Sequence, residues 1–388
     1  MQNKGTLHSF WTQEHIPRVL DGFWRIYAAL LRLSLITGKL RNELTEMVGA
    51  EDADILLSNV STDDEMLSSL GPLVGLTEVI RGEKSREDYL EQWGHRGPFE
   101  AEAAVPRPFE DPGWLDKQIE TFTKSGVDVR EMLTRQRARF DSAWSRLVER
   151  YPRKATRLRK RLEKVAKVNR MREAARSEFI RLTWITRAWA LRTGELTGIG
   201  DDIFFLTGEE ALELLNGTDT ATAYIPARRA MYERYKALPP YPLIISGRFD
   251  PFQWAADPDR STYLYDFHQQ NFVELLKSPS ENIILGTPGS AGQVEGTVRC
   301  LDTPDDWDKI QQGEILITSK TNIGWTLIFP KLGGIVTDIG AALSHAAIVA
   351  RELGIPAVVN CGDATTRLHT GDRVRIDGAQ GTVEILSL

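Results

Sequence analysis

His345 is the residue of this sequence whose surroundings most favour nucleophilic chemistry. It follows a run of small residues, 340–342, and comes directly after Ser344. Serine is a preferred helix N-cap, and a glycine such as Gly354 commonly ends a helix. The pattern therefore predicts a helix over about 344–353, with His345 in its first turn.

The first turn of a helix suits a negatively charged group. Its unpaired backbone N–H groups and the positive end of the helix dipole attract anions, and a neutral imidazole is a competent nucleophile. A phosphoryl group on a ring nitrogen of His345 would be stabilised there. A lone histidine at a helix start is more often a capping or core residue, so the surrounding sequence has to decide between the two interpretations.

The sequence around His345 resembles the phosphohistidine signature of the PEP-utilising enzymes. The similarity extends over about 284–388, and its matching stretches are G-T-P-G-S-A-G-Q-V-E-G-T-V-R (286–299), G-E-I-L-I-T (313–318), W-T-L-I-F (325–329), T-D-I-G-A-A-L-S-H-A-A-I-V-A-R-E-L-G-I-P-A-V-V (337–359) and the closing stretch 371–386. In this family the domain swivels and carries phosphate on the histidine from an ATP site to an acceptor site. The resemblance implies that His345 is the carrier and that its loop is supported by Thr337, Gly340, Ser344 and Arg351.

Two details favour the rifampicin phosphotransferase type within the family. Leu343 and Ser344 precede the histidine, where pyruvate-type enzymes usually have threonine followed by cysteine or serine. Only 43 residues follow His345, whereas a PEP-binding barrel follows in the pyruvate-type enzymes. We therefore expect neither PEP nor pyruvate as substrate. The sequence departs from the family pattern at Ala341-Ala342 and in T-N-I-G-W-T-L-I-F, 321–329, which affects the expected fine geometry of docking.

The chain changes character near residue 280. Before it, apolar residues recur at helical spacing, and we expect helices over 16–48, 62–93 and 128–192, the last broken at Tyr151-Pro152 because proline removes a backbone donor. After it, short β-rich runs alternate with Gly and Asp turns. The expected fold is α+β and multidomain: a mostly helical acceptor domain (1–277), a linker (278–285) and a swivelling β/β/α phosphohistidine domain (286–388).

The helical part resembles, more weakly, the acceptor-substrate domain of rifampicin phosphotransferase, and similar domains occur in phenylphosphate synthase. The matching pieces are W-G-H-R-G-P-F-E (93–100), P-R-P-F-E-D-P (106–112), R-E-A-A-R-S-E-F-I-R (172–181) and D-D-I-F-F-L-T (201–207). His95 and Arg96 lie in a rigid Gly/Pro loop of the kind that places functional groups, and arginine suits a phosphate. The alternative is a buried structural His–Arg pair.

A second group of charged residues falls on the basic segment after Pro152. Arg172 and Arg176 share a helix face at i and i+4 spacing, with Glu173 beside them. The arginines could neutralise a transferred phosphoryl group, and Glu173 could be a base for an acceptor hydroxyl. A solvated charged face is the alternative. We interpret the basic run 152–170 as a surface face or a docking face for an anionic partner.

Composition excludes several other classes of protein. The net charge of −6 and the lack of a reader motif argue against a nucleic-acid partner. No apolar run reaches the roughly 18 residues of a membrane span, and the N-terminus lacks a signal-peptide core. The two cysteines share no metal-type spacing, so no metal site is expected. These features together indicate a cytoplasmic protein without a membrane partner.

The sequence shows no sign of a nucleotide-binding site. The chain contains no G-x-x-x-x-G-K-[ST] motif, and no region resembles the ATP-grasp domain that binds ATP in this family. We therefore expect ATP and Mg²⁺ on an ATP-grasp-type partner subunit, or on a domain of a longer enzyme of which this chain is a fragment. The Met1 start slightly favours the separate subunit.

These observations lead to one main hypothesis and two alternatives. The main hypothesis is a phosphotransferase component in which His345 receives a phosphoryl group from the ATP-binding partner and passes it to a small-molecule hydroxyl acceptor in the helical domain. The first alternative is a non-catalytic phosphocarrier or regulatory protein phosphorylated at His345. The second is a degenerate binding module, against which the intact run 344–352 argues.

Overall fold

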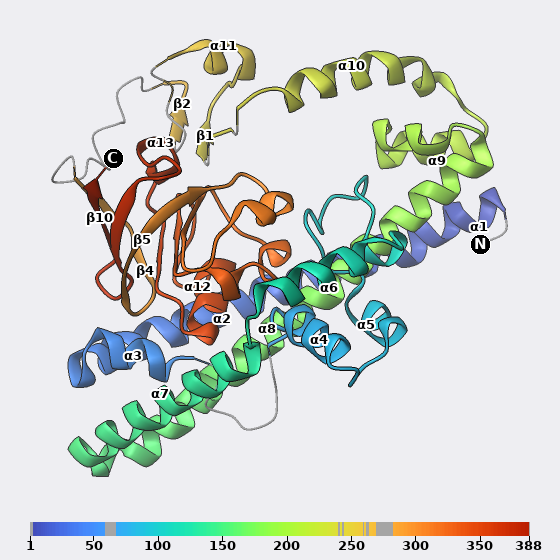
Figure 1. Cartoon of the computed structure of the whole chain (residues 1–388). Helices are drawn as coiled ribbons and strands as arrows, with labels where there is room; N and C mark the ends of the chain where they lie inside the picture. Colours follow the sequence, from blue (N-terminus) through green and yellow to red (C-terminus); the bar gives the residue numbers. More distant parts are fainter. Residues whose placement is uncertain are drawn as a thin grey trace. The chain divides into compact units, whose positions relative to one another are not determined.

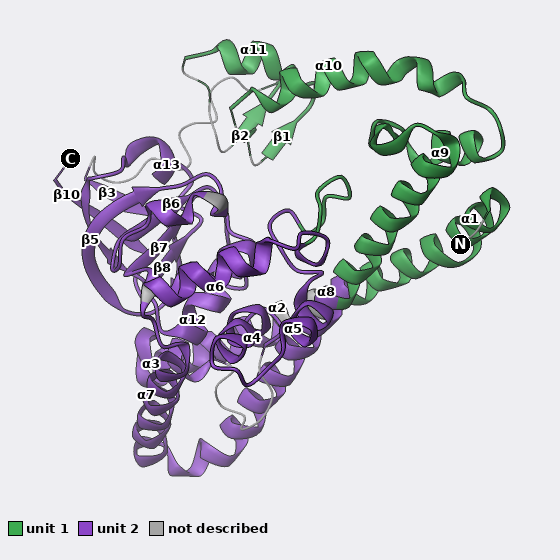
Figure 2. Cartoon of the chain, turned by 45° about the vertical axis from the view of Figure 1, so that its right-hand side comes forward, with its two compact units in different colours: residues 1–25, 100–107, 178–274 green, residues 26–99, 108–177, 275–388 purple. Residues whose placement is uncertain are grey.

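The computed structural model of the chain describes residues 3–58, 67–239, 241–242, 244–258, 260, 264–268 and 282–387. The chain folds into two compact units, drawn in two colours in Figure 2. Unit 1 comprises residues 1–25, 100–107 and 178–274, and unit 2 comprises 26–99, 108–177 and 275–388. Each unit is described separately. The β-rich C-terminal part thus belongs to the same unit as most of the helical part.

Unit 1 is a small helical assembly with one parallel pair of strands. Its core contains Leu7, Trp189 and Ile203, and the indole of Trp11 stacks on that of Trp189 with ring centroids 3.9 Å apart. Its elements are α1 (Lys4–Ser9), the π-helical turn Phe10–His15, α9 (Gly208–Leu215), α10 (Ile225–Lys236), β1 (Ile244–Ser246), α11 (Pro251–Ala256), β2 (Leu264–Asp266) and the 3-10 turns Gly200–Phe205 and Thr220–Tyr224. Two long helices, α2 (Ile16–Val48) and α8 (Pro152–Thr197), continue from unit 1 into unit 2.

Most helices of unit 2 form where the apolar periodicity predicted them, but the helices over 50–56 and 114–125 were not predicted. Helix α2 matches the expected 16–48, and the expected break at Tyr151 separates α7 (Val129–Arg150) from α8, which begins at Pro152. The other helices are α3 (Ala50–Leu56), α4 (Gly71–Ile80), α5 (Arg86–Trp93), α6 (Trp114–Ser125) and the 3-10 turn Pro108–Glu110. Of the expected helical stretch 62–93, residues 62–66 lie outside the described residues. Within the described ranges, no helix is both long and apolar enough to cross a membrane.

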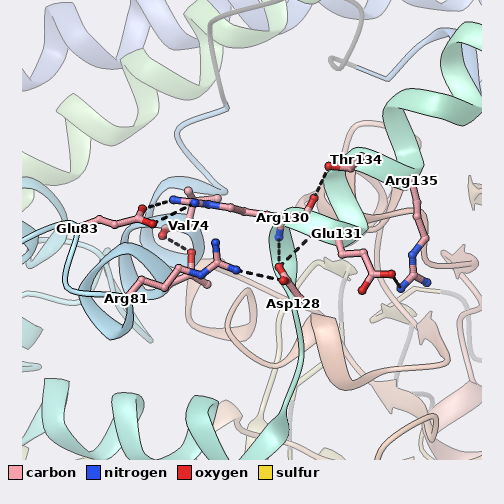
Figure 3. Close-up of polar contacts among 9 residues, drawn as sticks. Val74, Arg81, Glu83, Asp128, Arg130, Glu131, Thr134 and Arg135 are labelled. Atoms are coloured by element: carbon pink, nitrogen blue, oxygen red, sulfur yellow. Dashed lines mark hydrogen bonds and ion pairs between the residues drawn. The ribbon is translucent and has the colours of Figure 1, made fainter.

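Helix α7 is fixed at its N-terminus by charge pairs, which Figure 3 shows in close-up. Asp128 is the N-cap, and its carboxylate accepts hydrogen bonds from the backbone N–H groups of Arg130 and Glu131. The same carboxylate pairs with Arg81 at 3.1 Å, and Arg130 pairs with Glu83. Capping satisfies N–H groups that have no partner within a helix. The start of α7 is thus tied to the chain that follows α4.

The C-terminal part of unit 2 is an eight-stranded mixed sheet, seen with α12 (His345–Leu353) against it in Figure 1. The strand order is β3-β10-β9-β5-β6-β7-β8-β4. The strands are β3 (Ile283–Leu285), β4 (Thr287–Ser290), β5 (Gln293–Cys300), β6 (Ile315–Thr318), β7 (Gly334–Thr337), β8 (Ala357–Val359), β9 (Arg373–Asp377) and β10 (Thr382–Ser387). Short helices complete it: α13 (Ala364–Arg367) and the 3-10 turns Pro304–Lys309, Ile323–Trp325 and Phe329–Lys331. The expected α+β class, with a helical part followed by a β-rich domain, is confirmed.

Strands β6, β7 and β8, which pair in parallel, are buried on both faces of the sheet. In β6, Ile315 and Ile317 lie in one core while Leu316 lies in the other, and β7 alternates in the same way with Ile335 and Val336. Side chains of a strand point alternately to opposite faces, so short, almost continuously apolar strands are what a sheet covered on both sides requires. One core lies on the α12 side and the other on the α13 side.

The sheet begins at β3, which is the first of the short β-rich runs expected after residue 280. Strand β3 lies inside the interval 278–285 that the sequence indicated as a linker, and it pairs antiparallel with β10. Residues 278–281 of that interval lie outside the described residues. Strand β4, which contains Pro288, was not predicted; it occupies an edge of the sheet, where a proline costs no ladder hydrogen bond.

The α12 side of the sheet shares its core with the helices of unit 2. Leu73 and Leu76 of α4 and Val129 of α7 belong to the same apolar cluster as Ala346 and Val349 of α12. The side chain of Gln136 also donates a hydrogen bond to the backbone carbonyl of Arg351, at 2.8 Å. The β-rich part and these helices are thus packed together in this structure.

A buried charge cluster reinforces this packing. Asp54 of α3 pairs with Arg351 of α12 and with Arg41 of α2 at 2.8 and 2.7 Å, and it accepts the backbone N–H of Ala291 at 2.8 Å. Burial by itself would raise the pKa of Asp54, but the two arginines and the N–H group outweigh burial and lower it. The carboxylate is therefore ionised and satisfied at neutral pH.

We predict that Asp54→Ala destabilises the protein by about 3–5 kcal/mol, because it leaves the buried guanidinium of Arg351 without its partner. Urea unfolding at pH 7 measures this change. Asp52→Ala is the matched control: Asp52 is on the same helix and pairs with the exposed Arg146, so its removal should cost no more than about 1 kcal/mol. Equal effects of the two substitutions would contradict the role given to Asp54.

The lowered pKa also predicts a pH dependence. A carboxyl whose pKa is lower in the folded than in the unfolded protein stabilises the fold fully above its ordinary value of 3.8 and loses that contribution as the pH falls through the folded-state pKa. The free-energy difference between wild type and Asp54→Ala should therefore shrink below about pH 4. Urea unfolding repeated between pH 3 and 7 measures it, and a constant difference would contradict the assignment.

Candidate functional site

Helix α12 presents His345 as its first residue, as the sequence predicted. Ser344 is the N-cap, and its hydroxyl accepts the backbone N–H of Ala347 at 3.4 Å. Gly354 is the C-cap with φ 70°, a left-handed conformation that glycine adopts without strain. The imidazole thus projects from the helix end at which the dipole is positive.

Two threonine hydroxyls hold the imidazole of His345. Thr321 Oγ1 lies 3.1 Å from Nδ1, and Thr326 Oγ1 lies 3.1 Å from Nε2. The ring of Phe329 meets the imidazole edge-on, with centroids 5.8 Å apart. A hydroxyl can donate or accept, so this arrangement suits either neutral tautomer. The ring orientation is fixed by three contacts from one segment, 321–329.

The loop before α12 is closely packed at the residues that the resemblance indicated. The side chain of Thr337 is fully buried, and its hydroxyl donates to the backbone carbonyl of Ile339 at 2.9 Å. A Cβ atom on Gly340 would lie 2.8 Å from Cβ of Val359 and 3.2 Å from the hydroxyl of Ser344. No larger residue fits at position 340 without movement of the loop.

Arg351 stabilises this loop through hydrogen bonds and makes no contact with His345 among the hydrogen bonds described. Its guanidinium donates to the backbone carbonyls of Gly289 and Ala342, and to Asp54 as described above. The side chain is 5% exposed. Arg351 therefore acts on the geometry of the loop and the position of α12, and not on a phosphoryl group.

The structure brings the charged residues of the helical part to the histidine. The guanidinium of Arg172 donates to the backbone carbonyl of Leu343, two residues before His345, at 3.2 Å, and it also pairs with the carboxylate of Glu173. Both side chains are about 5% exposed. Arg176, on the next turn of α8, and the buried Arg96 are close enough to influence the ionisation of His345. Four of the five residues indicated in the helical part therefore lie near His345.

His95, the neighbour of Arg96 in the sequence, is held by a contact with helix α8. Its side chain is fully buried, and Nε2 lies 2.9 Å from the hydroxyl of Ser177 on α8. This contact holds the loop that carries Arg96 against α8. It favours the structural alternative for His95, whereas Arg96 is close enough to His345 to influence its ionisation.

The surroundings of His345 strongly disfavour its protonated form. Burial is the largest cause, and the positive charge of Arg176 is the next; together they lower the pKa of His345 to about 3. Glu173 opposes this effect, whereas Arg96 and Arg172 add to it. The imidazole is therefore neutral at physiological pH, which is the form that has a lone pair for attack on phosphorus.

Glu173 is held in its ionised form. Burial would raise its pKa, but the positive charge and hydrogen bond of Arg172, together with Arg176, outweigh burial and lower it. The carboxylate can accept a proton or a hydrogen bond from a hydroxyl. Its low pKa makes it a weak base, so charge neutralisation by the arginines is the larger contribution that this cluster can make.

Sequence analysis missed the residues that contact the imidazole directly. Thr321, Thr326 and Phe329 all lie in T-N-I-G-W-T-L-I-F, a stretch that carried the family resemblance. Two hydroxyl residues five positions apart in an otherwise apolar stretch were the available signal. The partner of Arg351, Asp54, was missed because nothing in the sequence links residues so far apart.

Part of the chain matches a family of known proteins. Residues 310–381 match the family model described as PEP-utilising enzyme, mobile domain. These residues are a PEP-utilising enzyme mobile domain. His345, its two threonines and α12 all belong to the mobile domain, and the resemblance to the rifampicin phosphotransferase type is confirmed by the relatives given next.

The relatives named transferases are considerably longer than this chain. Rifampicin phosphotransferase of Streptomyces sviceus is 28% identical over 84% of this chain and 36% of its own length. Rifampicin phosphotransferase of Bacillus cereus is 32% identical over 48% of the chain and 19% of its own length. The prodigiosin synthesizing transferase PigC of Serratia marcescens is 30% identical over 76% of the chain and 33% of its own length. The chain thus spans 36% or less of each of these relatives.

Throughout the described ranges, no group of three or more His, Cys, Asp or Glu side chains is arranged to hold a metal ion. The positive charges at the site come from side chains and the helix dipole, which is a donor set for a phosphoryl group.

We predict that the imidazole of His345 stays neutral from pH 8 down to about pH 4, because its pKa is about 3. Arg176→Gln removes a positive charge and should raise that pKa toward the ordinary value of 6.5. NMR of the imidazole nitrogens as a function of pH measures both, with His345→Gln to assign the resonances. Titration of wild-type His345 near pH 6.5 would contradict the charge cluster described here.

Proposed function

We propose that this chain is the acceptor and carrier part of a phosphotransferase, in which His345 receives a phosphoryl group that originates from ATP and passes it to a hydroxyl acceptor. The observation that carries the proposal is an imidazole at a helix N-terminus, held by two hydroxyls and close enough to Arg96, Arg172 and Arg176 for their charges to disfavour its protonation. Three arginines near a histidine that serves only to fill the core would be an unusual arrangement, whereas they suit a histidine that carries a negatively charged group.

The transfer balances without any further reactant. The oxygen of the acceptor hydroxyl attacks phosphorus in line with the bond to the ring nitrogen. The new P–O bond forms as the N–P bond breaks, and the electron pair of the N–P bond returns to that ring nitrogen of His345. The other ring nitrogen carries a proton throughout the step, so the ring leaves as neutral imidazole. The hydroxyl proton passes to the carboxylate of Glu173 or to solvent. Phosphoryl transfer proceeds through a loose transition state, so it needs positioning and charge stabilisation more than a strong base.

The arginines supply that charge stabilisation. A phosphoryl group carries up to two negative charges, and guanidinium groups bind its oxygens in fixed geometry. Arg172 and Arg176 come from consecutive turns of α8, and Arg96 comes from the loop that His95 holds against that helix. Preorganised charges of this kind cost no rearrangement at the moment of transfer.

The phosphoryl donor lies on another part of the system in this proposal. ATP and Mg²⁺ would be bound by an ATP-grasp-type partner subunit or domain, and this chain would contribute the carrier and the acceptor site. The greater length of the relatives supports this division. For the acceptor, the names of the relatives favour a small organic molecule.

We predict that the chain incorporates label from ATP labelled at the β- or γ-phosphate only when an extract of the source organism supplies the donor. The label should be acid-labile and base-stable, as expected for phosphohistidine, and should lie on the peptide that contains His345. His345→Ala should abolish labelling, whereas His369→Ala, which removes an exposed histidine of the mobile domain, should not. Undiminished label in His345→Ala would refute the carrier role.

A donor-independent experiment tests the arginine cluster. Phosphoramidate phosphorylates histidine directly, and ³¹P NMR follows the phosphohistidine signal. Arg176→Gln should slow its appearance by about tenfold or more, because a charge that stabilises the incoming phosphoryl group is lost. Arg153→Gln, an exposed arginine on the same helix, is the control and should react at the wild-type rate. Equal rates for all three proteins would show that Arg176 does not act on the phosphoryl group.

A further inference from the structure

A cavity of about 390 Å³ lies in unit 2, between the helical part and the mobile domain. Its size falls in the range of small-molecule sites. One wall comes from the loop after α5, the start of α4 and helix α6, and the other comes from the segments 304–307 and 323–331 of the mobile domain. The residues that matter for its chemistry are Arg96, Asp111, Trp114, Lys117, Phe122, Trp307 and Lys331.

The cavity is separate from the ring of His345 but adjoins its site. Along the segment 321–331, Thr326 and Phe329 contact the imidazole, whereas Leu327 and Ile328 line the cavity. The two sites therefore share one short segment of the chain. Arg96 belongs to both, because it lines the cavity and lowers the pKa of His345.

The lining combines aromatic rings with an excess of positive charge. Trp114, Phe122 and Trp307 offer flat apolar surfaces, and Nζ of Lys331 lies over the ring of Trp307, 5.5 Å from its centroid. The lining contains three cationic side chains, those of Arg96, Lys117 and Lys331, but only one carboxylate, that of Asp111. Flat surfaces select a planar ring system, and the cations select a negative substituent on it.

The two walls are held together by a close contact. A Cβ atom on Gly324 would lie 2.8–2.9 Å from three atoms of Pro98, so the absence of a side chain at Gly324 lets the mobile domain approach the loop 96–98. A ligand in the cavity would touch both walls at once. Its binding would therefore stabilise the packing of the mobile domain on the helical part, because a ligand favours the arrangement that it binds.

We propose that this cavity binds a planar aromatic molecule that carries an acidic group, such as an aromatic carboxylate or sulfonate, and that the packed mobile domain completes the site. Trp307 and Lys331 provide the mobile domain's share of the binding. The ligand is either the hydroxyl acceptor itself or a second molecule that binds only when the mobile domain is packed on the helical part. The first case deepens the proposed function and rests on it.

The probe for this site is 6-hydroxynaphthalene-2-sulfonate, whose fluorescence reports binding to the full chain. We expect saturable binding that weakens about tenfold or more in Trp307→Leu and in Lys331→Gln. Trp24→Leu and Lys309→Gln are the matched controls: Trp24 is exposed on α2, and Lys309 is an exposed lysine near Trp307. Both should bind as the wild type does, and circular dichroism checks that all variants are folded.

Two results would overturn the proposal. The first is wild-type affinity in both Trp307→Leu and Lys331→Gln, which would place the probe elsewhere. The second is that 2-naphthol, which lacks the sulfonate, binds as tightly as the probe, because the cationic side chains would then contribute nothing to recognition of an acidic group. The titration needs no phosphohistidine, so a failure of binding is distinguishable from a failure of phosphoryl transfer.

A second arm identifies the source of the ligand. The chain is phosphorylated with phosphoramidate and mixed with 6-hydroxynaphthalene-2-sulfonate or with naphthalene-2-sulfonate, which lacks the hydroxyl. Loss of the phosphohistidine signal, with formation of the naphthyl phosphate ester from the first compound alone, assigns the cavity to the acceptor. Binding of both compounds with no ester formed assigns it to a second ligand.

Discussion

The enclosure of α12 is the constraint on which the rest of unit 2 depends. Every residue of this helix after His345, from 346 to 353, is buried, because the sheet covers one side and the helices cover the other. A helix buried all round must satisfy its polar groups within the protein. Arg351 does so through Asp54 and two backbone carbonyls, and this single side chain joins α12, the loop before it, the edge strand β4 and helix α3.

Sequence alone could predict much of this arrangement. Ser344 and Gly354 defined the ends of α12, and Pro152 marked the start of α8, since capping and proline effects act over a few residues. The edge strand β4 could not be predicted, because a short stretch with a proline and a glycine has no strand pattern and pairs only once β8 is in place. Its formation is a tertiary effect.

The same distinction applies to the site. Arg172, Glu173 and Arg176 could be grouped from helical spacing, and Arg96 could be singled out from its Gly/Pro loop. Their approach to His345 could not be derived from the sequence, because it depends on packing between distant segments of the chain. Arg172 and Leu343, for example, are in contact although they are 171 residues apart. Thr321 and Thr326 were missed for a related reason: a hydroxyl in an apolar stretch gives no indication of its partner until the fold supplies one.

The charge cluster around His345 distinguishes between a proton and a phosphoryl group. A proton gives the imidazole a positive charge, which burial and the neighbouring arginines oppose. A phosphoryl group gives it negative charge, which the same arginines favour. The packed arrangement would therefore favour a phosphorylated His345 over a protonated one. If the mobile domain moves between a donor and this site, phosphorylation itself would shift its population toward the helical part, because an equilibrium shifts toward the state with the more favourable contacts. Loss of the phosphoryl group to an acceptor would remove that preference and allow the domain to leave.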